Sequence, residues 1–347
     1  MDMHGLRVGY VPYAPSFAPP GDRRRFVHYA QQRGLRFEIA DPDQHYDVVV
    51  LSERADLSVW SRFRGGRLVY DLIDSYLAIP RQDLKGLLRG TAKFIARQSR
   101  YPQLNYREAV RGMCRCAEAV ICTTEEQRRN IAPCCSNVHI ILDSHSMLAS
   151  RAKINYGAGT PFRLVWEGMP QNLGALQSLG RALCRVHRRM PIVLHVVTDS
   201  AFPRVLGRYW RTETRNFLAE FGFPVVMHEW REDRLAEVLT GCAMAIIPLD
   251  LEDPFSAGKP ENKLLLFWRM GMPTLVSATP AYCRAMANAG VPMACANDAE
   301  WEERILRYGG DEALRRWAGE RGRTFAETTH SEARLLEQWD AVFQSLA

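Results

Sequence analysis

Two lysines and an asparagine lie close together in residues 248–277, PLDLEDPFSAGKPENKLLLFWRMGMPTLVS. Asn262 and Lys263 lie three and four residues after Lys259, so a helix would carry all three on one face. An apolar run of strand length, residues 243–249, comes just before them. Ammonium and amide groups at a helix N-terminus, just beyond the end of a strand, form a binding site for an anion. In an α/β sheet the natural anion at that place is a phosphate or a pyrophosphate.

The same residues contain the signals of a short helix between two strands. Pro260 suits the first helical position, because its missing N–H would have no partner there. Gly271 suits the end of the helix, since glycine enters the left-handed region without strain. A second apolar strand then begins at residues 274–277. A solvated amphipathic surface helix is the alternative interpretation, because a short motif by itself is a weak signal.

This segment resembles the nucleotide-binding segment of GT-B glycosyltransferases, the large group that includes family 4. In that group a Lys-x-x-Asn-Lys-Leu-Leu segment leads into a short helix and a Gly-x-Pro turn. The matching residues here are Lys259, Asn262, Lys263, Leu264, Leu265, Gly271 and Pro273. The resemblance implies that the ligand is a nucleotide-sugar.

The resemblance extends loosely over the whole chain and implies an α/β protein with the GT-B fold. Two Rossmann-like, doubly wound domains would face a central cleft, and the C-terminal helix would cross back to the first domain. We expect an N-terminal, acceptor-side domain over residues 1–150 and a nucleotide-sugar-binding domain over residues 151–330. We expect residues 331–347 to form the helix that packs on the N-terminal domain.

The resemblance also indicates donor-binding residues around and beyond the lysine segment. Gly168 follows the first strand of the second domain, where GT-B enzymes place loop amides near the donor phosphates. Trp230 follows a later strand, and the resemblance places the nucleotide base near it; ordinary packing is the alternative. Glu261 and Leu264 complete the predicted donor-binding residues.

The segment departs from the better-known family 4 pattern, Glu-x7-Glu. Counting back from Gly271 places Leu266 and Gly258 at the two glutamate positions. The carboxylate that binds ribose in the family is therefore replaced or absent, and both a retaining and an inverting mechanism stay open. An inverting enzyme would need a base on the acceptor side.

Three aspartates are the candidates for a catalytic base, because each falls near the C-terminal end of a predicted strand in the first domain. Asp22 lies in the loop after the first strand, which faces the ligand crevice in a nucleotide-type α/β domain, and we favour it. Asp71 and Asp74 follow the strand over residues 66–70. Helix capping is the alternative role for Asp22 and Asp74.

Basic residues recur every four positions in the middle of the first domain, at Arg81, Lys85, Arg89, Lys93 and Arg97. Leucine, phenylalanine and isoleucine interleave with them, so a helix would carry a basic stripe. Such a helix can rest on an anionic bilayer. Lipid-linked acceptors, which are common among bacterial GT-B enzymes, favour this membrane or acceptor role, and a solvated helix face is the alternative.

The composition restricts the classes of protein to which the chain can belong. The 347 residues, 47% of them hydrophobic, suffice for two domains with sizeable cores, and a net charge of +6 is too mild to indicate a nucleic-acid partner. No uninterrupted apolar run reaches the roughly 18 residues of a membrane span, and we expect no signal peptide. The nine cysteines lack paired metal spacing and indicate buried thiols in a reducing cytosol. We predict no metal and no cofactor, because the nucleotide-sugar is the substrate.

The leading hypothesis is a cytoplasmic, metal-independent glycosyltransferase of the hexosyltransferase type, peripheral on the inner face of the plasma membrane. It would move a sugar from a nucleotide-sugar donor to a polysaccharide or lipid-linked glycan acceptor. One alternative is a nucleotide-sugar epimerase or hydrolase of the same fold, which would act on the donor alone. Another is a non-catalytic nucleotide-binding subunit of a capsule-assembly complex.

Overall fold

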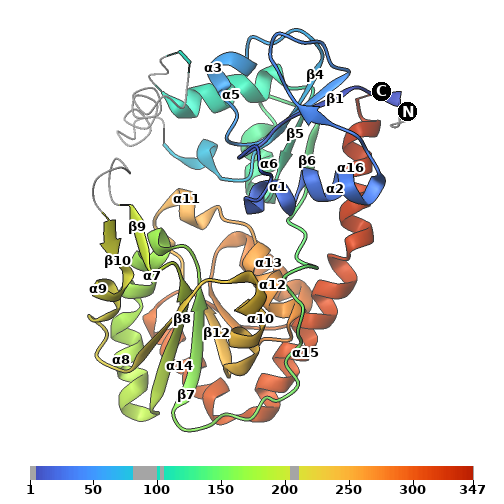
Figure 1. Ribbon diagram of the computed structural model, residues 1–347. Coiled ribbons are helices and arrows are strands. Elements are labelled where there is room, and N and C mark those ends of the chain that lie inside the picture. Colours follow the sequence, from blue (N-terminus) through green and yellow to red (C-terminus); the bar gives the residue numbers. More distant parts are fainter. Residues whose placement is uncertain (1–4, 81–99, 102–104, 204–210, 347) are drawn as a thin grey trace. The chain divides into compact units, whose positions relative to one another are not determined.

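The computed structural model describes residues 5–80, 100–101, 105–203 and 211–346 (Figure 1). Contacts between residues divide the chain into two compact units. Unit 1 consists of Met1–Ser144, Pro254–Pro260 and Glu332–Ala347, and unit 2 consists of His145–Asp253 and Glu261–Ser331. Each unit is built on one six-stranded sheet.

The sheet of unit 1 is parallel throughout, with the strand order β2-β1-β3-β4-β5-β6. Parallel sheets are buried on both faces, so their strands read as continuous apolar runs, and β3 reads VVVL. Alternate residues serve two cores: Val49 packs into one cluster and Val48 and Val50 into the other. The strands are β1 (Val8–Val11), β2 (Glu38–Ile39), β3 (Val48–Leu51), β4 (Arg67–Asp71), β5 (Ala119–Cys122) and β6 (Val138–Ile140).

Several helices of unit 1 begin at side-chain caps. The Asn105 and Thr124 side chains each accept a hydrogen bond from the N–H of a residue three positions later, which satisfies a donor at the start of the helix. The helical segments are α1 (Pro20–Arg23), α2 (Phe26–Arg33), α3 (Leu57–Trp60), η2 (Tyr76–Ala78), α5 (Tyr106–Cys116), α6 (Glu125–Ile131), α11 (Pro254–Ala257) and α16 (Glu332–Gln344).

The C-terminal helix α16 returns to unit 1, where it lies beside α2 (Figure 1). Trp339 is fully buried and stacks on Tyr29 with 5.4 Å between ring centroids. At the edge of this contact Asp340 accepts hydrogen bonds from Arg33 and from the Tyr29 hydroxyl. An apolar face with a polar rim therefore fixes the last helix to the first sheet.

A short segment from late in the sequence, Pro254–Pro260, also belongs to unit 1. The ring of Phe255 lies 5.4 Å from that of Tyr76, and the Ser75 hydroxyl donates to the carbonyl oxygen of Gly258 at 2.7 Å. The segment carries Lys259, so this predicted donor residue lies in unit 1.

The main sheet of unit 2 is parallel and has the strand order β11-β8-β7-β12-β13-β14. Its strands are β7 (Phe162–Glu167), β8 (Ile192–Thr198), β11 (Val225–Glu229), β12 (Met244–Ile247), β13 (Thr274–Ser277) and β14 (Ala294–Cys295). A separate antiparallel pair consists of β9 (Ala201–Pro203) and β10 (Arg211–Glu213).

The helices of unit 2 include α12, which carries Asn262 and Lys263 of the predicted anion site. Gly271 follows this helix with a φ of 68°, in the left-handed region that the sequence predicts for its end. The helical segments are η3 (Pro170–Asn172), α7 (Leu173–Ser178), α8 (Gly180–Arg189), α9 (Thr214–Leu218), α10 (Glu232–Gly241), α12 (Asn262–Arg269), α13 (Pro280–Ala289), α14 (Asp298–Gly310) and α15 (Glu312–Thr329).

The predicted fold class is confirmed: two parallel, doubly wound α/β units are present, and the C-terminal helix returns to the first. In each sheet the strand order reverses direction at one place, between β1 and β3 in unit 1 and between β7 and β12 in unit 2. Ligands of open α/β sheets bind beyond the carboxyl ends of the strands at such a switch point. Among the described helices, none combines the length and hydropathy required to cross a membrane.

Candidate functional site

Glu167, the last residue of β7, stands at the switch point of unit 2. The first turn of α12 brings Lys263 to it. The Lys263 ammonium donates to the backbone carbonyl oxygen of Glu167 at 2.5 Å and lies 3.1 Å from its Oε2 atom. The side chains of Lys263 and Glu167 are 28% and 14% exposed, so both are accessible to a ligand. The predicted anion-binding lysine therefore lies at the place where an α/β sheet binds ligands.

Trp230 reaches the same carboxylate from the loop after β11. Its indole N–H donates to the Oε1 atom of Glu167 at 3.1 Å. Glu167 thus accepts from Trp230 through one oxygen and pairs with Lys263 through the other. The contact fixes the position of a half-buried aromatic ring, and such a ring can stack on a nucleotide base.

Gly168 makes room for this arrangement. A Cβ atom at Gly168 would lie 2.8 Å from the Trp166 ring and 3.1 Å from the Lys263 Nζ atom. The Lys263 Nζ atom is also 5.8 Å from the centre of the Trp166 ring. A larger residue at position 168 would therefore displace either the ring or the ammonium.

The remaining predicted residues of the lysine segment divide between surface and core. Glu261 and Asn262 are partly exposed at the start of α12. Leu264 is fully buried, and its part in donor binding stays a prediction. Its backbone is within the first turn of α12, and its side chain packs in the core.

In unit 1, Asp22 orders the loop that follows β1. It is fully buried within α1 and accepts hydrogen bonds from the Tyr10 hydroxyl at 2.6 Å and from the Tyr13 N–H at 2.8 Å. The Ala14 N–H adds a third at 3.3 Å. The N-cap residue of α1 is Pro19, so the capping role considered for Asp22 is wrong. The observed contacts favour a loop-ordering role over the predicted role as a base.

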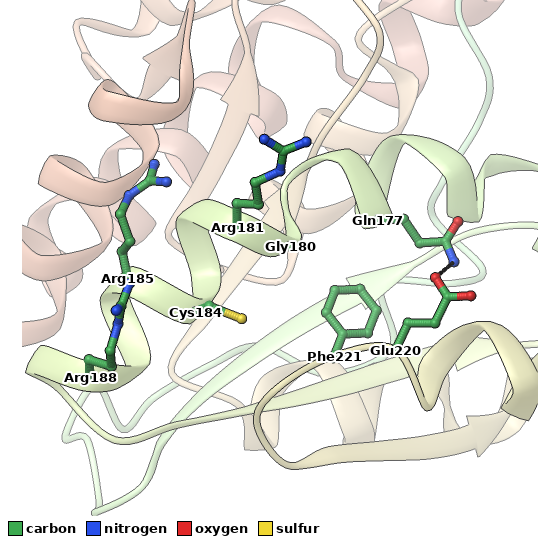
Figure 2. A pocket seen from close by; sticks show the side chains of 8 residues that line it. All are labelled: Gln177, Gly180, Arg181, Cys184, Arg185, Arg188, Glu220 and Phe221. Carbon is green, nitrogen blue, oxygen red and sulfur yellow. Dashed lines mark hydrogen bonds between the residues drawn. The ribbon is translucent and has the colours of Figure 1, made fainter.

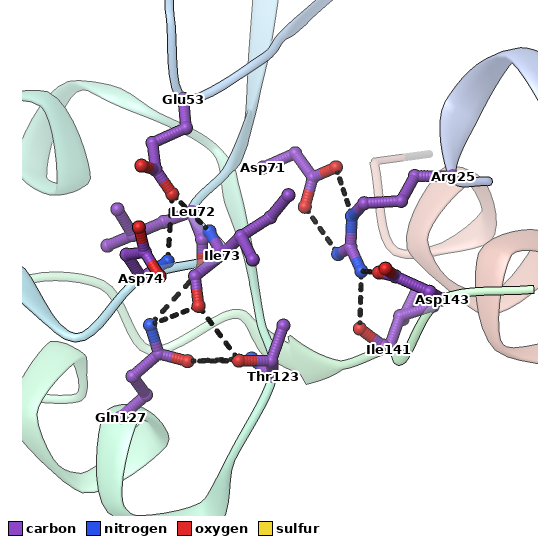
Figure 3. A network of polar contacts seen from close by, with 10 residues as sticks. All are labelled: Arg25, Glu53, Asp71, Leu72, Ile73, Asp74, Thr123, Gln127, Ile141 and Asp143. Atoms are coloured by element: carbon purple, nitrogen blue, oxygen red, sulfur yellow. Dashed lines mark hydrogen bonds and ion pairs between the residues drawn. The ribbon is translucent and has the colours of Figure 1, made fainter. Parts of the chain in front are cut away.

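Asp71 forms a buried bidentate ion pair with Arg25 (Figure 3). Arg25 donates from Nε at 2.7 Å and from Nη2 at 2.5 Å, and its Nη1 atom donates to Asp143 and to the Ile141 carbonyl oxygen at 3.0 Å. Burial raises the pKa of Asp71, and the Arg25 charge opposes this shift. The pair ties β4 to the loop before α2, which favours a structural role for Asp71 over the predicted catalytic one.

Asp74 is the most exposed of the three predicted aspartates, and it lies beside Glu53. The Oε2 atom of Glu53 accepts from the N–H groups of Ile73 and Asp74 at 3.0 Å and 2.8 Å (Figure 3). Burial, together with the charge of Asp74, raises the pKa of Glu53 to about 7. The sequence alone did not single out Glu53. It follows the strand β3 almost directly, and the rule that selected Asp71 and Asp74 could have selected it.

Solved structures that match the fold of this chain include glycosyltransferases. Sucrose-phosphate synthase from Thermosynechococcus elongatus matches with a TM-score of 0.59 and 13% identity, over 92% of this chain and 76% of its own. WaaG, a glycosyltransferase involved in lipopolysaccharide biosynthesis, matches with a TM-score of 0.58 and 13% identity, over 96% of this chain and 99% of its own. The chain has the GT-B fold.

A third structure with the GT-B fold, that of TarM, matches with a TM-score of 0.58 and 11% identity over 85% of this chain. The chain spans about half of TarM, since the match covers 54% of that protein. A form of TarM has been solved in complex with UDP. No protein-family model and no curated protein matches the sequence.

Within the GT-B fold, the structure explains the missing glutamates of the family 4 pattern. Leu266 is 4% exposed and packs in the core of unit 2, so a carboxylate at this position would be buried. At Gly258 an added Cβ atom would lie 2.4 Å from the Ser75 hydroxyl oxygen. Both positions therefore have a local physical reason to lack a carboxylate.

A cavity of about 420 Å³ on unit 2 contains none of the predicted residues (Figure 2). One face of α8 contributes Arg181, Arg185 and Arg188. Arg185 pairs with Glu302 at 2.7 Å, and Glu220, which also lines the cavity, accepts from Gln177. Two acidic groups thus reduce the positive potential that the three arginines create.

The basic stripe and the metal independence are among the sequence predictions that remain predictions. The basic stripe of Arg81, Lys85, Arg89, Lys93 and Arg97 lies outside the described residues. Within the part of the chain that the structure describes, no group of three or more histidines, cysteines or carboxylates is placed to hold a metal ion. Metal independence stays an expectation that a chelator can test.

Proposed function

We propose that this protein is a glycosyltransferase that takes a sugar from a nucleotide-sugar donor and passes it to a glycan or lipid-linked glycan. The observation that carries the proposal is the contact of Lys263 and Trp230 with Glu167 at the switch point of unit 2. One carboxylate thus holds both an ammonium group suited to a phosphate and an aromatic ring suited to a nucleotide base. The GT-B fold and the UDP bound by TarM support the same class of donor.

The chemistry requires a cation near the leaving group. A nucleoside diphosphate departs with negative charge on its phosphates, and a fixed ammonium stabilises that charge as it develops. Lys263 would supply this ammonium, and the first N–H groups of α12 would add their partial positive charge. Asn262 and Lys259 remain predicted contributors to phosphate binding.

We assign the activation of the acceptor hydroxyl to a residue of unit 1. Among the three predicted aspartates, Asp22 and Asp71 are buried, while Asp74 is partly exposed. We therefore prefer Asp74 as the base of an inverting reaction. Asp74→Asn is expected to abolish transfer and to spare donor binding; full turnover by this variant would exclude Asp74.

The donor is tested by thermal unfolding against a panel of nucleoside diphosphates and nucleotide-sugars, because a ligand that binds the native state raises its stability. We expect one nucleotide class to raise the melting temperature. Lys263→Ala should lose this shift, and Arg234→Ala, an exposed change on α10 in the same unit, should keep it. No shift with any nucleotide would contradict the proposal.

Product analysis separates the transferase from the alternatives. Consumption of the donor without an acceptor would indicate an epimerase or hydrolase, and binding without turnover would indicate a non-catalytic subunit. Activity after exhaustive chelation is expected from the prediction of metal independence, and loss of activity that a divalent metal restores would contradict it.

The peripheral membrane location is proposed from the sequence of the basic stripe. Each basic residue near an anionic bilayer contributes about 1 kcal/mol. Changing Arg89, Lys93 and Arg97 to glutamate should abolish flotation with vesicles that contain anionic lipids. Unchanged flotation would contradict a membrane role for these residues and leave the donor site unaffected.

A further inference from the structure

The contacts of the unit 2 site run from Trp230 through Glu167 to Lys263, which is the order of base, ribose and phosphates in a nucleotide. Trp230 contacts one oxygen of Glu167 and Lys263 contacts the other, so the carboxylate lies between an aromatic ring and an ammonium. In a nucleotide the ribose lies between the base and the phosphates. We propose that Glu167 is the specificity-determining residue that accepts hydrogen bonds from the ribose hydroxyls of the donor, an inference that rests on the proposed function.

The carboxylate has the capacity for this role. An ionised glutamate accepts about four hydrogen bonds, and the contacts to Trp230 and Lys263 occupy two of these positions. The side chain is 14% exposed, so it is held in place while it remains accessible. The ribose 2′ and 3′ hydroxyls are adjacent donors, and the remaining acceptor positions match them.

The lysine keeps its own role in this arrangement. An ammonium has three N–H donors, and Lys263 directs one to the Glu167 carbonyl oxygen and one toward Oε2. The third is available to a phosphate oxygen. Glu167 also orients Trp230 through the indole N–H, so one residue would connect base, ribose and phosphate recognition.

Leu266 occupies the position of the ribose-binding carboxylate in the family 4 pattern, and its side chain is buried. The carboxylate nearest along the sequence is Glu261, which directly precedes α12. Glu167 is favoured over Glu261 because Glu167 contacts both Trp230 and Lys263. The end of β7 would thus supply the ribose-binding carboxylate that α12 supplies in the family 4 pattern.

Calorimetric titration of the full chain tests this assignment. The titrants are UDP, GDP and ADP, the 2′-deoxy and 3′-deoxy forms of whichever binds, and inorganic pyrophosphate. Glu167→Gln should weaken the ribonucleotide about tenfold or more, since a hydrogen bond to a charged group is replaced by one to a neutral amide. Pyrophosphate should bind Glu167→Gln at least as well as the native chain, because a negative charge near Lys263 is removed. Glu237→Gln, an exposed change on α10, is the matched control.

The deoxynucleotides decide whether the effect passes through the ribose. The native chain should bind at least one deoxy form about tenfold more weakly than the ribonucleotide, and this difference should be clearly smaller in Glu167→Gln, whose neutral amide accepts a weaker hydrogen bond. An unchanged deoxy penalty in Glu167→Gln, or its disappearance in Glu261→Gln, would overturn the assignment. An equal loss of pyrophosphate affinity would also overturn it, because Glu167 would then act only by holding Lys263. If no nucleotide binds the native chain, the proposed function itself fails.

Discussion

The Ser75 hydroxyl donates a hydrogen bond of 2.7 Å to the backbone carbonyl oxygen of Gly258. This contact seats Pro254–Pro260 against the loop between β4 and η2, within unit 1. Gly258 also stands where the family 4 pattern has its first glutamate. The close approach of Ser75 explains why the position has no side chain, and it leads to the first prediction.

Gly258→Ala should weaken the seating of this segment. The new Cβ atom would lie 2.4 Å from the Ser75 Oγ atom and 2.6 Å from its Cβ atom. Such overpacking costs about 1–3 kcal/mol of stability or displaces the segment. Hydrogen exchange should show reduced protection in Pro254–Pro260, and thermal unfolding should occur at a lower temperature.

A second substitution makes this prediction specific. Ser75→Gly removes both atoms that the new methyl group would meet, so Ser75→Gly combined with Gly258→Ala should regain part of the lost protection. Additive losses in the double variant would show that the contact does not limit the size of residue 258.

Restoring the missing glutamate of the family pattern should harm the protein. Leu266→Glu places a carboxylate in the core of unit 2, where the native side chain is 4% exposed. An unpaired buried charge costs about 3 kcal/mol or more, or is neutralised by protonation. Urea unfolding at neutral pH should show this loss, and Leu266→Met, which conserves volume, should cost less than about 1.5 kcal/mol. Equal stability of the two variants would contradict the burial of this position.

The sequence predicted the local parts of the candidate site and missed how they pair. The glycine at the end of α12 and the apolar strand β12 identify the place of Lys263, because turn chemistry and strand hydrophobicity are local properties. The contact between Lys263 and Glu167 joins residues 96 positions apart, and no spacing rule reports it. The same limit explains Glu53, whose partners include backbone N–H groups of the loop that follows the next strand, β4.

The position of a carboxylate at the end of a strand also did not reveal its role. Asp22 lies in the segment after β1 and Asp71 is the last residue of β4. Both are satisfied by partners from other elements, the Tyr10 hydroxyl and the Arg25 guanidinium. Topology places a residue at the ligand end of a sheet, and only the tertiary contacts decide whether it faces a ligand. A buried carboxylate with strong donors is typical of a structural residue.

Replacing one partner of the Arg25–Asp71 pair should lower the stability of the protein more than replacing both partners. Arg25→Met leaves Asp71 buried without its bidentate partner, at a cost of about 3–5 kcal/mol. Asp71→Leu alone should cost a similar amount, since it leaves the Arg25 guanidinium without this carboxylate. The double variant should be more stable than the sum of the two losses predicts, and denaturant unfolding of all four proteins measures this coupling. Strict additivity would mean that the pair is not energetically coupled.

Glu53 should make the stability of the protein depend on pH. Its pKa is raised to about 7 in the folded chain, and an unfolded glutamate has a pKa of about 4.3. Between these values the folded chain holds a proton that the unfolded chain has lost, so the free energy of unfolding falls as pH rises. The stabilisation is complete below about pH 4 and is lost as pH passes through about 7, by a total on the order of 3 kcal/mol.

The matched variants isolate this effect from other titrating groups. Glu53→Gln keeps an oxygen for the N–H groups of Ile73 and Asp74 and cannot ionise. Urea unfolding at pH 5 and pH 8 should therefore show a smaller loss of stability for Glu53→Gln than for the native chain. Asp43→Asn, an exposed change in a turn of unit 1, should retain the native difference. If Glu53→Gln loses as much stability as the native chain over this range, the proton resides on another group, and Asp74 is the first to examine, because its charge contributes to the raised pKa of Glu53.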